Sequence, residues 1–438
     1  MAEDDKLPPK GRFLRFRKLA ALSARVGTDV LAKGVRRLAG GDPEMLSKST
    51  AEKLVATLGD LKGAAMKLGQ LASMDSQLLT PEVRAVLARL QNQAPSMPYA
   101  RVREVVEAEL GAPPERLFAT FDESPMAAAS LGQVHRATME DGRKVAVKVQ
   151  YPGIGEALTS DLDNLGLLVG TLSKTTRVLD GRAYFNELRN EMVLEIDYRR
   201  EAALAQAFAH AAAPLSDLKV PAVIEERTSQ RVLTLELIDG HTLRDFAAAG
   251  PSLPERFRVS RLLIRSIYGP FLLAGEIHAD PHPGNFIVMP DGRLGLLDFG
   301  SVKRFSPTFV QVNRRMFTQA LRQESLDYLE LSRAIGVSID LPDEEARALL
   351  GQFFHIAGKP LRSEDYDYAT DDTVWEAKRL FRKHATQFLK IRPPAEAVMF
   401  FRSTGGLSQN LRLLGARGNF RLVYEELAHL VAHLEQAQ

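Results

Sequence analysis

The sequence predicts an α+β protein in which a small β-rich lobe precedes a larger helical lobe. Two observations support this class. The stretch "VHRATMEDGRKVAVKVQYPG" places two apolar segments on either side of Asp141-Gly142, a pattern typical of two strands joined by a tight turn. From Ser252 onward most segments have helical patterns, with clear helix starts such as Pro342 followed by three acids.

Composition bounds the class and the location of the protein. The 438 residues are 45% hydrophobic and 26% charged, which is ordinary globular composition and argues against disordered or fibrous classes. The absence of cysteine excludes disulfides, cysteine-ligated metals and thiol catalysis. No run approaches the roughly 18 apolar residues of a spanning helix, and no apolar signal core is seen. We therefore expect a cytoplasmic protein without a transmembrane segment, peripheral to the inner membrane if it is attached at all.

Residues 1–45 are expected to form a basic N-terminal helix. Residues 6–37 carry ten Lys or Arg and a single acid, Asp29. Two interpretations remain open: a solvated helix packed on the body of the protein, and an element that lies on an anionic membrane surface. Nucleic acid is not an expected partner, because Phe13 and Phe16 are almost the only aromatic residues interleaved with these charges.

The remaining chain divides into three predicted segments. Residues 46–115 form a helical extension that carries "KLGQ". Residues 116–240 form the β-rich lobe, in which 183–213 has a long helical pattern and "VPAVIEERTSQRVLTLELIDG" the pattern of strand, turn and strand. Residues 241–438 form the helical lobe, interrupted by two short strands around Asp291-Gly292.

Three short motifs in a fixed order carry the chemistry. "VAVK" places Lys148 at the end of a valine-rich strand, "HADPHPGN" holds Asp280 and Asn285 five residues apart, and Asp298 in "LLDFG" ends an apolar strand. Lysine, then Asp-x4-Asn, then Asp-Phe-Gly is the signature set of protein kinases. Lys148 would bind the α- and β-phosphates, Asn285 and Asp298 would hold Mg²⁺, and Asp280 would orient or deprotonate the acceptor.

A kinase lysine also needs a carboxylate from a neighbouring helix. In "NELRNEMVLEIDYRREAAL", a helical period places Glu187, Glu191 and Glu195 on one face and Asp197 and Glu201 on another. Carboxylates on two faces of the predicted helix imply that they pair with two different groups.

The chain resembles the UbiB/AarF family of atypical, protein-kinase-like proteins, which is linked to ubiquinone biosynthesis. The motifs that carry the resemblance are "KLGQ", "AAASLGQVHRA", "VAVKVQYPG", "EIDYRREA", "HADPHPGN" and "DFG". The resemblance implies a bilobal protein-kinase-like fold, an extra helical extension packed on the active site, and extra C-terminal helices.

The resemblance also implies roles for single residues. Glu195 would pair with Lys67 of the extension, and Glu201 with Lys148. The residues implied in regulation are Lys67, Gln70, Glu195 and Asp197. The residues assigned to the nucleotide, besides Lys148, are Ala127, Ala128, Ala129, Ser130, Glu236 and Ile238.

The family's alanine-rich loop replaces the glycine-rich loop of ordinary kinases, and Gly132 is the one glycine retained nearby. Because alanine restricts φ and adds a methyl group, we expect a stiffer loop, an altered nucleotide preference and weak protein kinase activity. No Ala-Pro-Glu follows "DFGSVKRFSPTF", and no arginine precedes Asp280. A lipid, another small acceptor or water is therefore expected in place of a protein hydroxyl.

The predicted function is that of an ATP-binding, Mg²⁺-dependent atypical kinase or ATPase. It would support isoprenoid-quinone synthesis or lipid homeostasis at a membrane surface, with quinone-precursor lipids or biosynthetic enzymes as partners. Two alternatives remain: a small-molecule phosphotransferase, and a nucleotide-gated scaffold without catalysis. The pairs Phe353-Phe354 and Phe400-Phe401 are expected in the core, although they could also line a lipid-facing groove.

Overall fold

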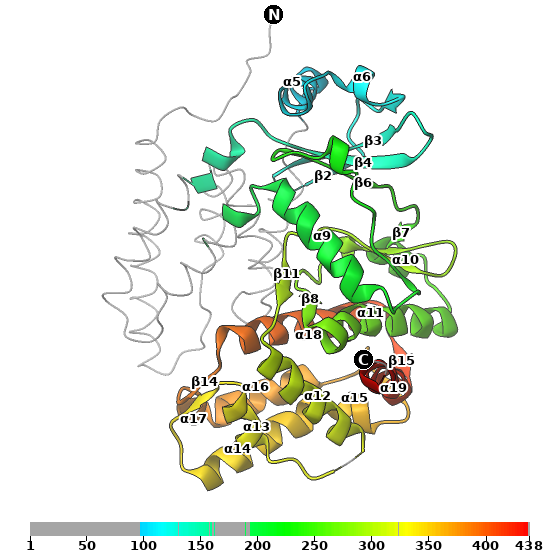
Figure 1. The fold of residues 1–438 in the computed structure, drawn as a ribbon. Coiled ribbons are helices and arrows are strands. Elements are labelled where there is room, and N and C mark those ends of the chain that lie inside the picture. Colours follow the sequence, from blue (N-terminus) through cyan, green and yellow to red (C-terminus); the bar gives the residue numbers. More distant parts are fainter. Residues whose placement is uncertain are drawn as a thin grey trace, which may run out of the picture. The chain divides into compact units, whose positions relative to one another are not determined.

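The computed structural model describes residues 97–436, apart from Ser130, Gln323 and most of 157–192 (Figure 1). The chain divides into two compact units, Met1–Arg200 with Val223–Leu237, and Glu201–Ala222 with Ile238–Gln438. The predicted basic helix, and Lys67 and Gln70 of the predicted extension, lie outside the described residues. The domain boundaries drawn from the sequence stay predictions.

The first unit is built on an antiparallel sheet that contains the predicted strand pair. Gly142, with a φ of 87°, makes the turn between β3 and β4. The spatial order is β1-β3-β4-β6, with β2 paired to β3. The strands are β1 (Thr120–Phe121), β2 (Ala127–Ala128), β3 (Gly132–Thr138), β4 (Lys144–Gln150) and β6 (Val232–Glu236).

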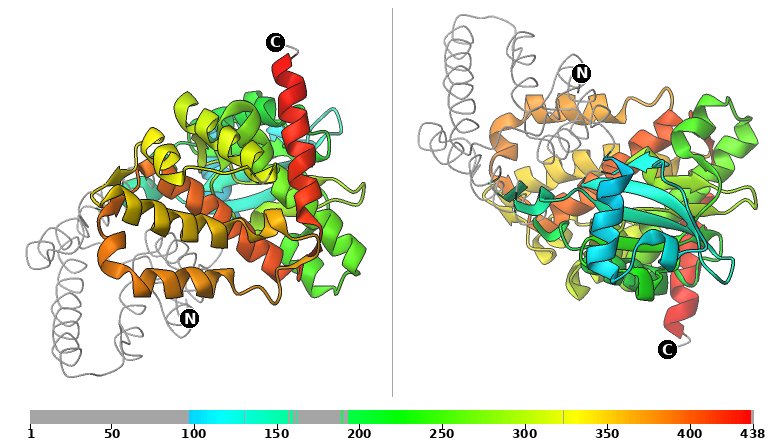
Figure 2. Two further views of the ribbon diagram at one scale, coloured as in Figure 1. Left: turned by 90° about the horizontal axis from the view of Figure 1, so that it is seen from below. Right: turned by 90° about the horizontal axis from the view of Figure 1, so that it is seen from above.

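Helix α5 (Tyr99–Leu110) covers one face of this sheet, and α6 (Pro114–Leu117) follows it (Figure 2, right). The period of two places Val145, Val147 and Val149 in the core against α5. Their burial stabilises the unit by roughly 1.5–3 kcal/mol each. The same alternation directs Lys148 to the opposite face, where it is half-buried.

The second unit contains a mixed four-stranded sheet, ordered β5-β10-β9-β7, and a separate pair of β8 and β11. The hairpin of β9 and β10 is the predicted one, with Gly292 at a φ of 91°. The bounds are β5 (Leu218–Lys219), β7 (His241–Thr242), β8 (Glu276–His278), β9 (Phe286–Val288), β10 (Leu294–Leu296) and β11 (Val302–Arg304). Two short pairs complete the strands: β12 (Ser338–Ile339) with β14 (Ile391–Arg392), and β13 (Tyr366–Asp367) with β15 (Arg417–Gly418).

Helices make up most of the second unit. The long α11 starts with a capping box of Ser252 and Glu255 and ends at Gly275, and it packs on α18 and α19 (Figures 1 and 2). The bounds are α9 (Tyr198–Ala212, beginning in the first unit), α10 (Leu243–Ala248), α11 (Leu253–Ala274), α12 (Pro307–Leu321), α13 (Tyr328–Ala334), α14 (Asp343–Ala357), α15 (Lys359–Arg362), α16 (Thr373–Lys383), α17 (Ala385–Phe388), α18 (Ala395–Leu413) and α19 (Phe420–Gln436).

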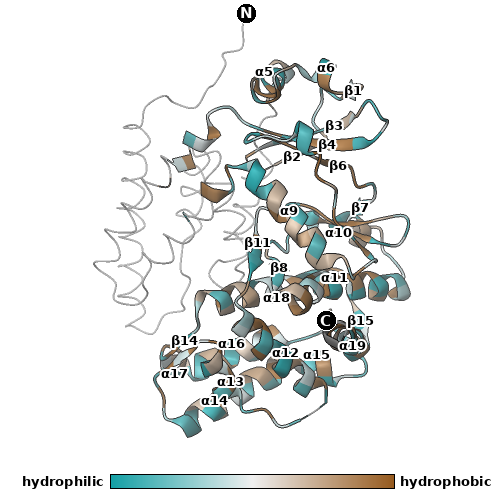
Figure 3. Cartoon of the chain, in the orientation of Figure 1, coloured by the Kyte–Doolittle hydropathy of each residue, from teal (hydrophilic) through white to brown (hydrophobic). Residues whose placement is uncertain are grey.

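The predicted α+β class is confirmed. Figure 3 shows hydrophobic residues on strands of the sheets and on parts of the helices. No helix among the described residues has both the length and the hydropathy needed to cross a bilayer.

Two local predictions are wrong. The first segment of "VPAVIEERTSQRVLTLELIDG" is no strand, because Val223 makes a single bridge to Leu235 and the chain then turns into the 3₁₀ helix η1 (Glu225–Arg227). The helical pattern over 183–213 is interrupted at residues 195–197, and α9 starts afresh at Tyr198. The assignment of the carboxylates to two faces of one helix therefore does not hold.

Candidate active site

Residues 280–285 connect β8 to β9, and are called the catalytic loop below after the role that the sequence predicts for Asp280. Nδ2 of Asn285 donates to Oδ2 of Asp280 at 2.8 Å and to the backbone carbonyl of Asp280 at 3.3 Å. The bend is completed by the 3₁₀ turn η2 (Pro283–Asn285) and by His282, whose Nδ1 accepts from the N–H of Gly284. Asp280 is buried, and its amide partner fixes Oδ2. The other oxygen, Oδ1, is suited to accept a proton.

Asp298 follows β10 in a left-handed backbone conformation. Its φ is 60°, and among the described residues it is the only non-glycine with a positive φ. Such strain costs about 1–3 kcal/mol and is typical of functional positions. The N–H of the preceding Leu297 donates to the carbonyl of Asn285 at 2.8 Å. This bond ties the chain that carries Asp298 to the end of the catalytic loop.

The donor chemistry of these residues fits Mg²⁺. This ion prefers oxygen ligands, and it commonly uses one or two carboxylates while it keeps several waters. Because Nδ2 of Asn285 faces Asp280, its Oδ1 is the atom that could bind a cation. Asn285 and Asp298 are therefore the residues that would hold the metal.

A buried aromatic cluster packs beside the catalytic loop and the segment that carries Asp298. His278 is completely buried, and its Nε2 donates to the carbonyl of Leu297 at 2.9 Å, since a carbonyl can only accept. Phe299 is also completely buried, and its ring lies 5.5 Å from His278 and 5.7 Å from Phe208 of α9. His278 therefore has a structural role.

Helix α18 braces the catalytic loop from a distant part of the sequence. Nδ2 of the buried Asn410 donates to the carbonyl of Pro281 at 2.8 Å. One turn earlier, a Cβ on Gly406 would lie 2.0 Å from Cγ of Pro281, so only glycine lets the helix approach this closely. Sequence reasoning missed both residues, because no local pattern marks a contact over 129 positions.

In the first unit, Lys148 lies over an aromatic ring. Its Nζ is 4.9 Å from the ring centroid of Tyr198, which is 1% exposed. Such a cation–π contact holds the ammonium group on this face of the sheet. Tyr198 belongs to the "EIDYRREA" motif, but only the acids of that motif were assigned a role.

The Glu-x-Asp motif is attached to the same strand as Lys148. Nε2 of the buried Gln150 donates to the carbonyl of Ile196 at 2.6 Å, between Glu195 and Asp197. Asp197 accepts from the N–H of Arg199 at 3.0 Å, which makes it the N-cap of α9. The helix-start rule could have identified this role, since an aspartate directly precedes the helical segment.

Glu201 is buried in the first turn of α9, three residues after Tyr198. Residues three apart lie on the same helix face, so Glu201 shares a face with the ring beneath Lys148. Glu201 and Lys148 belong to different units, and their pairing stays a prediction.

Residues 127–132, called the alanine hairpin below, run from β2 to the first residue of β3. Ala129 and Gly132 exchange backbone hydrogen bonds of 2.9 and 3.4 Å, and Ser130 lies outside the described residues. Ala127 and Ala128 are exposed. A Cβ on Gly132 would lie 2.0 Å from the carbonyl oxygen of Val149. The retained glycine is therefore explained by the close approach of β4.

Glu236 and Ile238 flank the point where the chain leaves the sheet. Glu236 ends β6 opposite Val145. Ile238 packs on β10, where its Cγ2 would lie 2.7 Å from a Cβ on Gly295. The structure thus brings Asp280, Asn285 and Asp298 together in the second unit and places Lys148 with Tyr198 in the first.

Comparison with known proteins places the chain in a family. The ABC1 atypical kinase-like domain matches residues 89–332. Atypical kinase coq-8, mitochondrial, of Caenorhabditis elegans is 32% identical over 404 residues, which cover 90% of this chain and 53% of that protein. Atypical kinase COQ8B, mitochondrial, of Rattus norvegicus is 31% identical over 406 residues, with 89% and 75% covered. The chain thus spans about half the length of the first relative and three quarters of the second.

A solved structure agrees with this placement. The complex of Rv3197 with erythromycin from Mycobacterium tuberculosis has a TM-score of 0.59 and 28% identity, and the match covers 92% of this chain and 98% of that one. The predicted kinase-like fold and kinase class are confirmed at this level. The chain belongs to the ABC1 family of atypical kinases, the UbiB/AarF family that its motifs indicated.

Proposed function

We propose that this protein binds ATP together with Mg²⁺ and transfers the γ-phosphoryl group to a small acceptor or to water. The observation that carries the proposal is the bond between Asp280 and Asn285, joined to Asp298 through the Leu297 N–H. A proton acceptor and two oxygen ligands are thereby held in one short region. Phosphoryl transfer depends mostly on positioning and on neutralising charge, which is what such a set can supply.

The roles follow from the chemistry of each group. Asp280 orients the acceptor and receives its proton, and Asn285 and Asp298 hold the cation. When bound, Mg²⁺ neutralises charge on the phosphate oxygens. Lys148 binds the α- and β-phosphates, with Glu201 as its carboxylate partner and the ring of Tyr198 limiting its movement.

The nucleotide site and its control are proposed from the family motifs. The alanine hairpin closes over the phosphates. The hydrogen bonds exchanged between Ala129 and Gly132 fix its backbone, so it is less adaptable than the glycine-rich loop of ordinary kinases. Glu236 and Ile238 border the base. Lys67, Gln70 and Glu195 form the regulatory contact over the site. Asp197 supports that contact as the cap of α9, which fixes the position of Glu195 two residues earlier.

The pathway is proposed from the family. Relatives named COQ8 are mitochondrial atypical kinases, and the UbiB/AarF resemblance links the family to ubiquinone biosynthesis. We propose that this protein supports isoprenoid-quinone synthesis or lipid homeostasis from a peripheral position on a membrane. A lipid, another small molecule or water is the acceptor, because no Ala-Pro-Glu follows Asp298, so the segment that docks protein substrates in ordinary kinases is absent or remodelled.

Phosphate release from Mg²⁺-ATP tests the proposal, measured with and without anionic liposomes. Asp280→Asn should lower turnover about 10²–10⁴-fold and leave nucleotide binding intact. Asp298→Asn should abolish Mg²⁺-nucleotide binding. Asp291→Asn is the matched control, because Asp291 pairs with Arg293 in an exposed turn and should change neither quantity.

Each other outcome has a defined meaning. Equal loss of binding in Asp280→Asn and Asp298→Asn would contradict the separate roles of acceptor and metal ligand. Nucleotide binding without turnover under either condition would favour the scaffold. Turnover only in the presence of a soluble alcohol or amine would favour the small-molecule phosphotransferase.

A further inference from the structure

The helical part of the second unit encloses a cavity of about 360 Å³. It lies among α11, α12, α14, α15, α18 and α19, outside the candidate active site. Aromatic rings supply much of its wall: Phe271, Phe309, Phe353, Phe354, Phe400 and Phe401. Phe401 is 43% exposed, so the cavity reaches the surface on this side. Its volume falls within the roughly 300–1,000 Å³ range of sites for small molecules.

Apart from Arg362, the polar groups in the wall are neutral. Thr373, Thr404 and Ser408 contribute hydroxyls, and Tyr268 contributes a phenol whose pKa is raised to about 12 by desolvation. Arg362 also lines the cavity, but it is exposed and its guanidinium donates to the carbonyl of His355.

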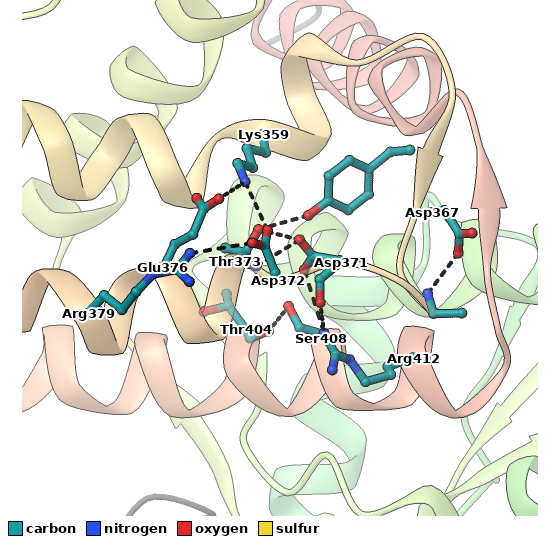
Figure 4. A network of polar contacts seen from close by, with 12 residues as sticks. Lys359, Asp367, Asp371, Asp372, Thr373, Glu376, Arg379, Thr404, Ser408 and Arg412 are labelled. Carbon is teal, nitrogen blue, oxygen red and sulfur yellow. Dashed lines mark hydrogen bonds and ion pairs between the residues drawn. The ribbon is translucent and has the colours of Figure 1, made fainter.

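The charged side chains beside Thr373 neutralise one another (Figure 4). Lys359 contacts Glu376 at 2.7 Å and Asp372 at 3.3 Å, and Arg379 contacts the same Asp372 at 3.5 Å. An ionic ligand would find no uncompensated partner in this network. The hydroxyl hydrogens of Thr373, Thr404 and Ser408 are donated to Asp371 and to backbone carbonyls, so these oxygens are left to accept. The chemistry of the wall fits a neutral, largely apolar molecule with a hydroxyl group that donates to them.

Helix α18 separates the cavity from the catalytic loop. Thr404 and Ser408, one turn apart, line the cavity, whereas Gly406 and Asn410 contact Pro281. At 100° per residue the two pairs lie about 200° apart, on opposite faces of the helix. A Cβ at position 406 would overlap Pro281, so the backbone of α18 packs directly against the loop with no side chain between them. A shift of α18 must therefore move Pro281, which neighbours Asp280.

We propose that this cavity binds a neutral apolar molecule, and that α18 transmits its occupancy to the catalytic loop. The binding site stands on the cavity alone, whereas the transmitted effect rests on the proposed nucleotide function. The sequence favoured a core role for the four phenylalanines at 353, 354, 400 and 401, and their place in the wall supports the alternative. Since linkage is reciprocal, the molecule and Mg²⁺-ADP must change each other's affinity by one common factor.

Binding is tested with Nile red, a neutral aromatic dye, titrated into the full chain and followed by its fluorescence. We expect saturable binding of one dye per chain. Gly405→Leu should weaken it at least tenfold, because Gly405 lines the cavity and a Cβ there meets nothing within 4 Å. Gly351→Leu is the matched control: Gly351 also lies in a helix with open space at its Cβ, and it does not line the cavity.

Ser408→Leu provides a second variant that fills the cavity. The hydroxyl of Ser408 bonds only the carbonyl of Thr404 in its own helix, so its loss breaks no contact between helices. Unchanged dye affinity in both filled variants, or equal loss in Gly351→Leu, would overturn the site.

Transmission is tested by repeating the dye titration with saturating Mg²⁺-ADP. We expect the dye affinity to change about fivefold or more, and the ADP affinity to change by the same factor when the dye is bound. Asn410→Ala, which removes the bond to Pro281, should bind the dye normally and lose most of this coupling. Thermal melting checks that Asn410→Ala folds. If it does not fold, Asn410→Ser replaces it in the same titration.

The two proposals fail in different ways. Absence of Mg²⁺-ADP binding without dye would refute the proposed nucleotide site and leave the cavity test standing. ADP binding that is indifferent to dye would refute the transmission through α18.

Discussion

The catalytic loop and the alanine hairpin are both short connections assigned to the nucleotide, yet they are held in different ways. The catalytic loop is held by side chains: the amides of Asn285 and Asn410 reach Asp280 and Pro281. The alanine hairpin is held by the backbone, through bonds between Ala129 and Gly132. The difference fits the two proposed roles: a loop that does chemistry would need oriented side chains, whereas a loop that covers phosphates would need a fixed backbone path.

The two regions also differ in where glycine occurs and in where the backbone is strained. In the hairpin, Gly132 exists because β4 passes too close for a Cβ. Beside the catalytic loop, Asp298 keeps a carboxylate at a position whose backbone favours glycine. Geometry decides the residue in the first case, and chemistry decides it in the second. The five predictions below begin with this contrast and extend it to the residues around the two loops.

The largest effect is expected at Gly132. Gly132→Ala should lower the free energy of unfolding by about 3 kcal/mol, because the new Cβ would meet the carbonyl of Val149 at 2.0 Å and Cα of Gln150 at 2.9 Å. Urea unfolding measures the change. The matched variant Ala128→Gly, in an exposed strand of the same hairpin, should cost about 0.5–1 kcal/mol.

The same pair of variants also tests the stiffness of the hairpin. Ala128→Gly should shift the preference between nucleotides, or raise self-phosphorylation, because the backbone gains freedom. An unchanged nucleotide profile would remove stiffness as the explanation. Equal stability losses in Gly132→Ala and Ala128→Gly would remove the backbone contact as the reason for the glycine.

The next effect separates strain from chemistry at Asp298. Asp298→Gly and Asp298→Ala should both abolish Mg²⁺-nucleotide binding, since both lose the carboxylate. The glycine variant should nevertheless be more stable than the alanine variant by about 1–2 kcal/mol, because only glycine adopts a φ of 60° without a clash. Denaturant unfolding without nucleotide gives the stabilities. Equal stability of the two would mean that the backbone there stores no strain.

A smaller effect is expected at the ring under Lys148. Tyr198→Leu removes the cation–π contact, worth about 0.5–1 kcal/mol, and should weaken Mg²⁺-ATP binding about two- to fivefold. Tyr198→Phe keeps the ring and should bind like the parent. Isothermal titration of both variants decides the matter: if Phe weakens binding as much as Leu, the ring face is not what positions Lys148.

The smallest effect is a pH dependence in the hairpin's own strand. Desolvation lowers the pKa of His135 on β3, although its bond to the Asp122 carbonyl opposes the shift. Below the unfolded value of 6.5 the unfolded chain takes up a proton that the folded chain resists. Stability should therefore be complete above pH 6.5 and fall below it. His135→Gln should flatten the profile between pH 7.5 and 5.5, and an unchanged slope would assign the dependence to another group.

The residues of the catalytic loop and the turns of the two hairpins could be predicted because each lies within a short stretch of sequence. Asp280 and Asn285 are five residues apart in one turn, and the hairpins at Gly142 and Gly292 follow from their turn residues. Helical periodicity misled where it assumed continuity, since Asp197 caps a new helix and does not extend the previous one.

Long-range support could not be predicted. The contact of Asn410 with Pro281 depends on how α18 packs, and no spacing rule links positions 129 residues apart. The same holds for Tyr198, whose ring meets Lys148 only because the start of α9 is anchored to β4 through Gln150.

The backbone bond from the Leu297 N–H to the Asn285 carbonyl makes the half of the site that we propose to hold the metal visible to hydrogen exchange. Together with the bond from the Ala279 N–H to the Ser301 carbonyl, it joins the chain segments on both sides of Asp280 to those on both sides of Asp298. Exchange of either amide requires its bond to open, so segments that separate as one unit should give both amides the same free energy of opening. Their protection would report the integrity of this half of the site in the absence of any nucleotide.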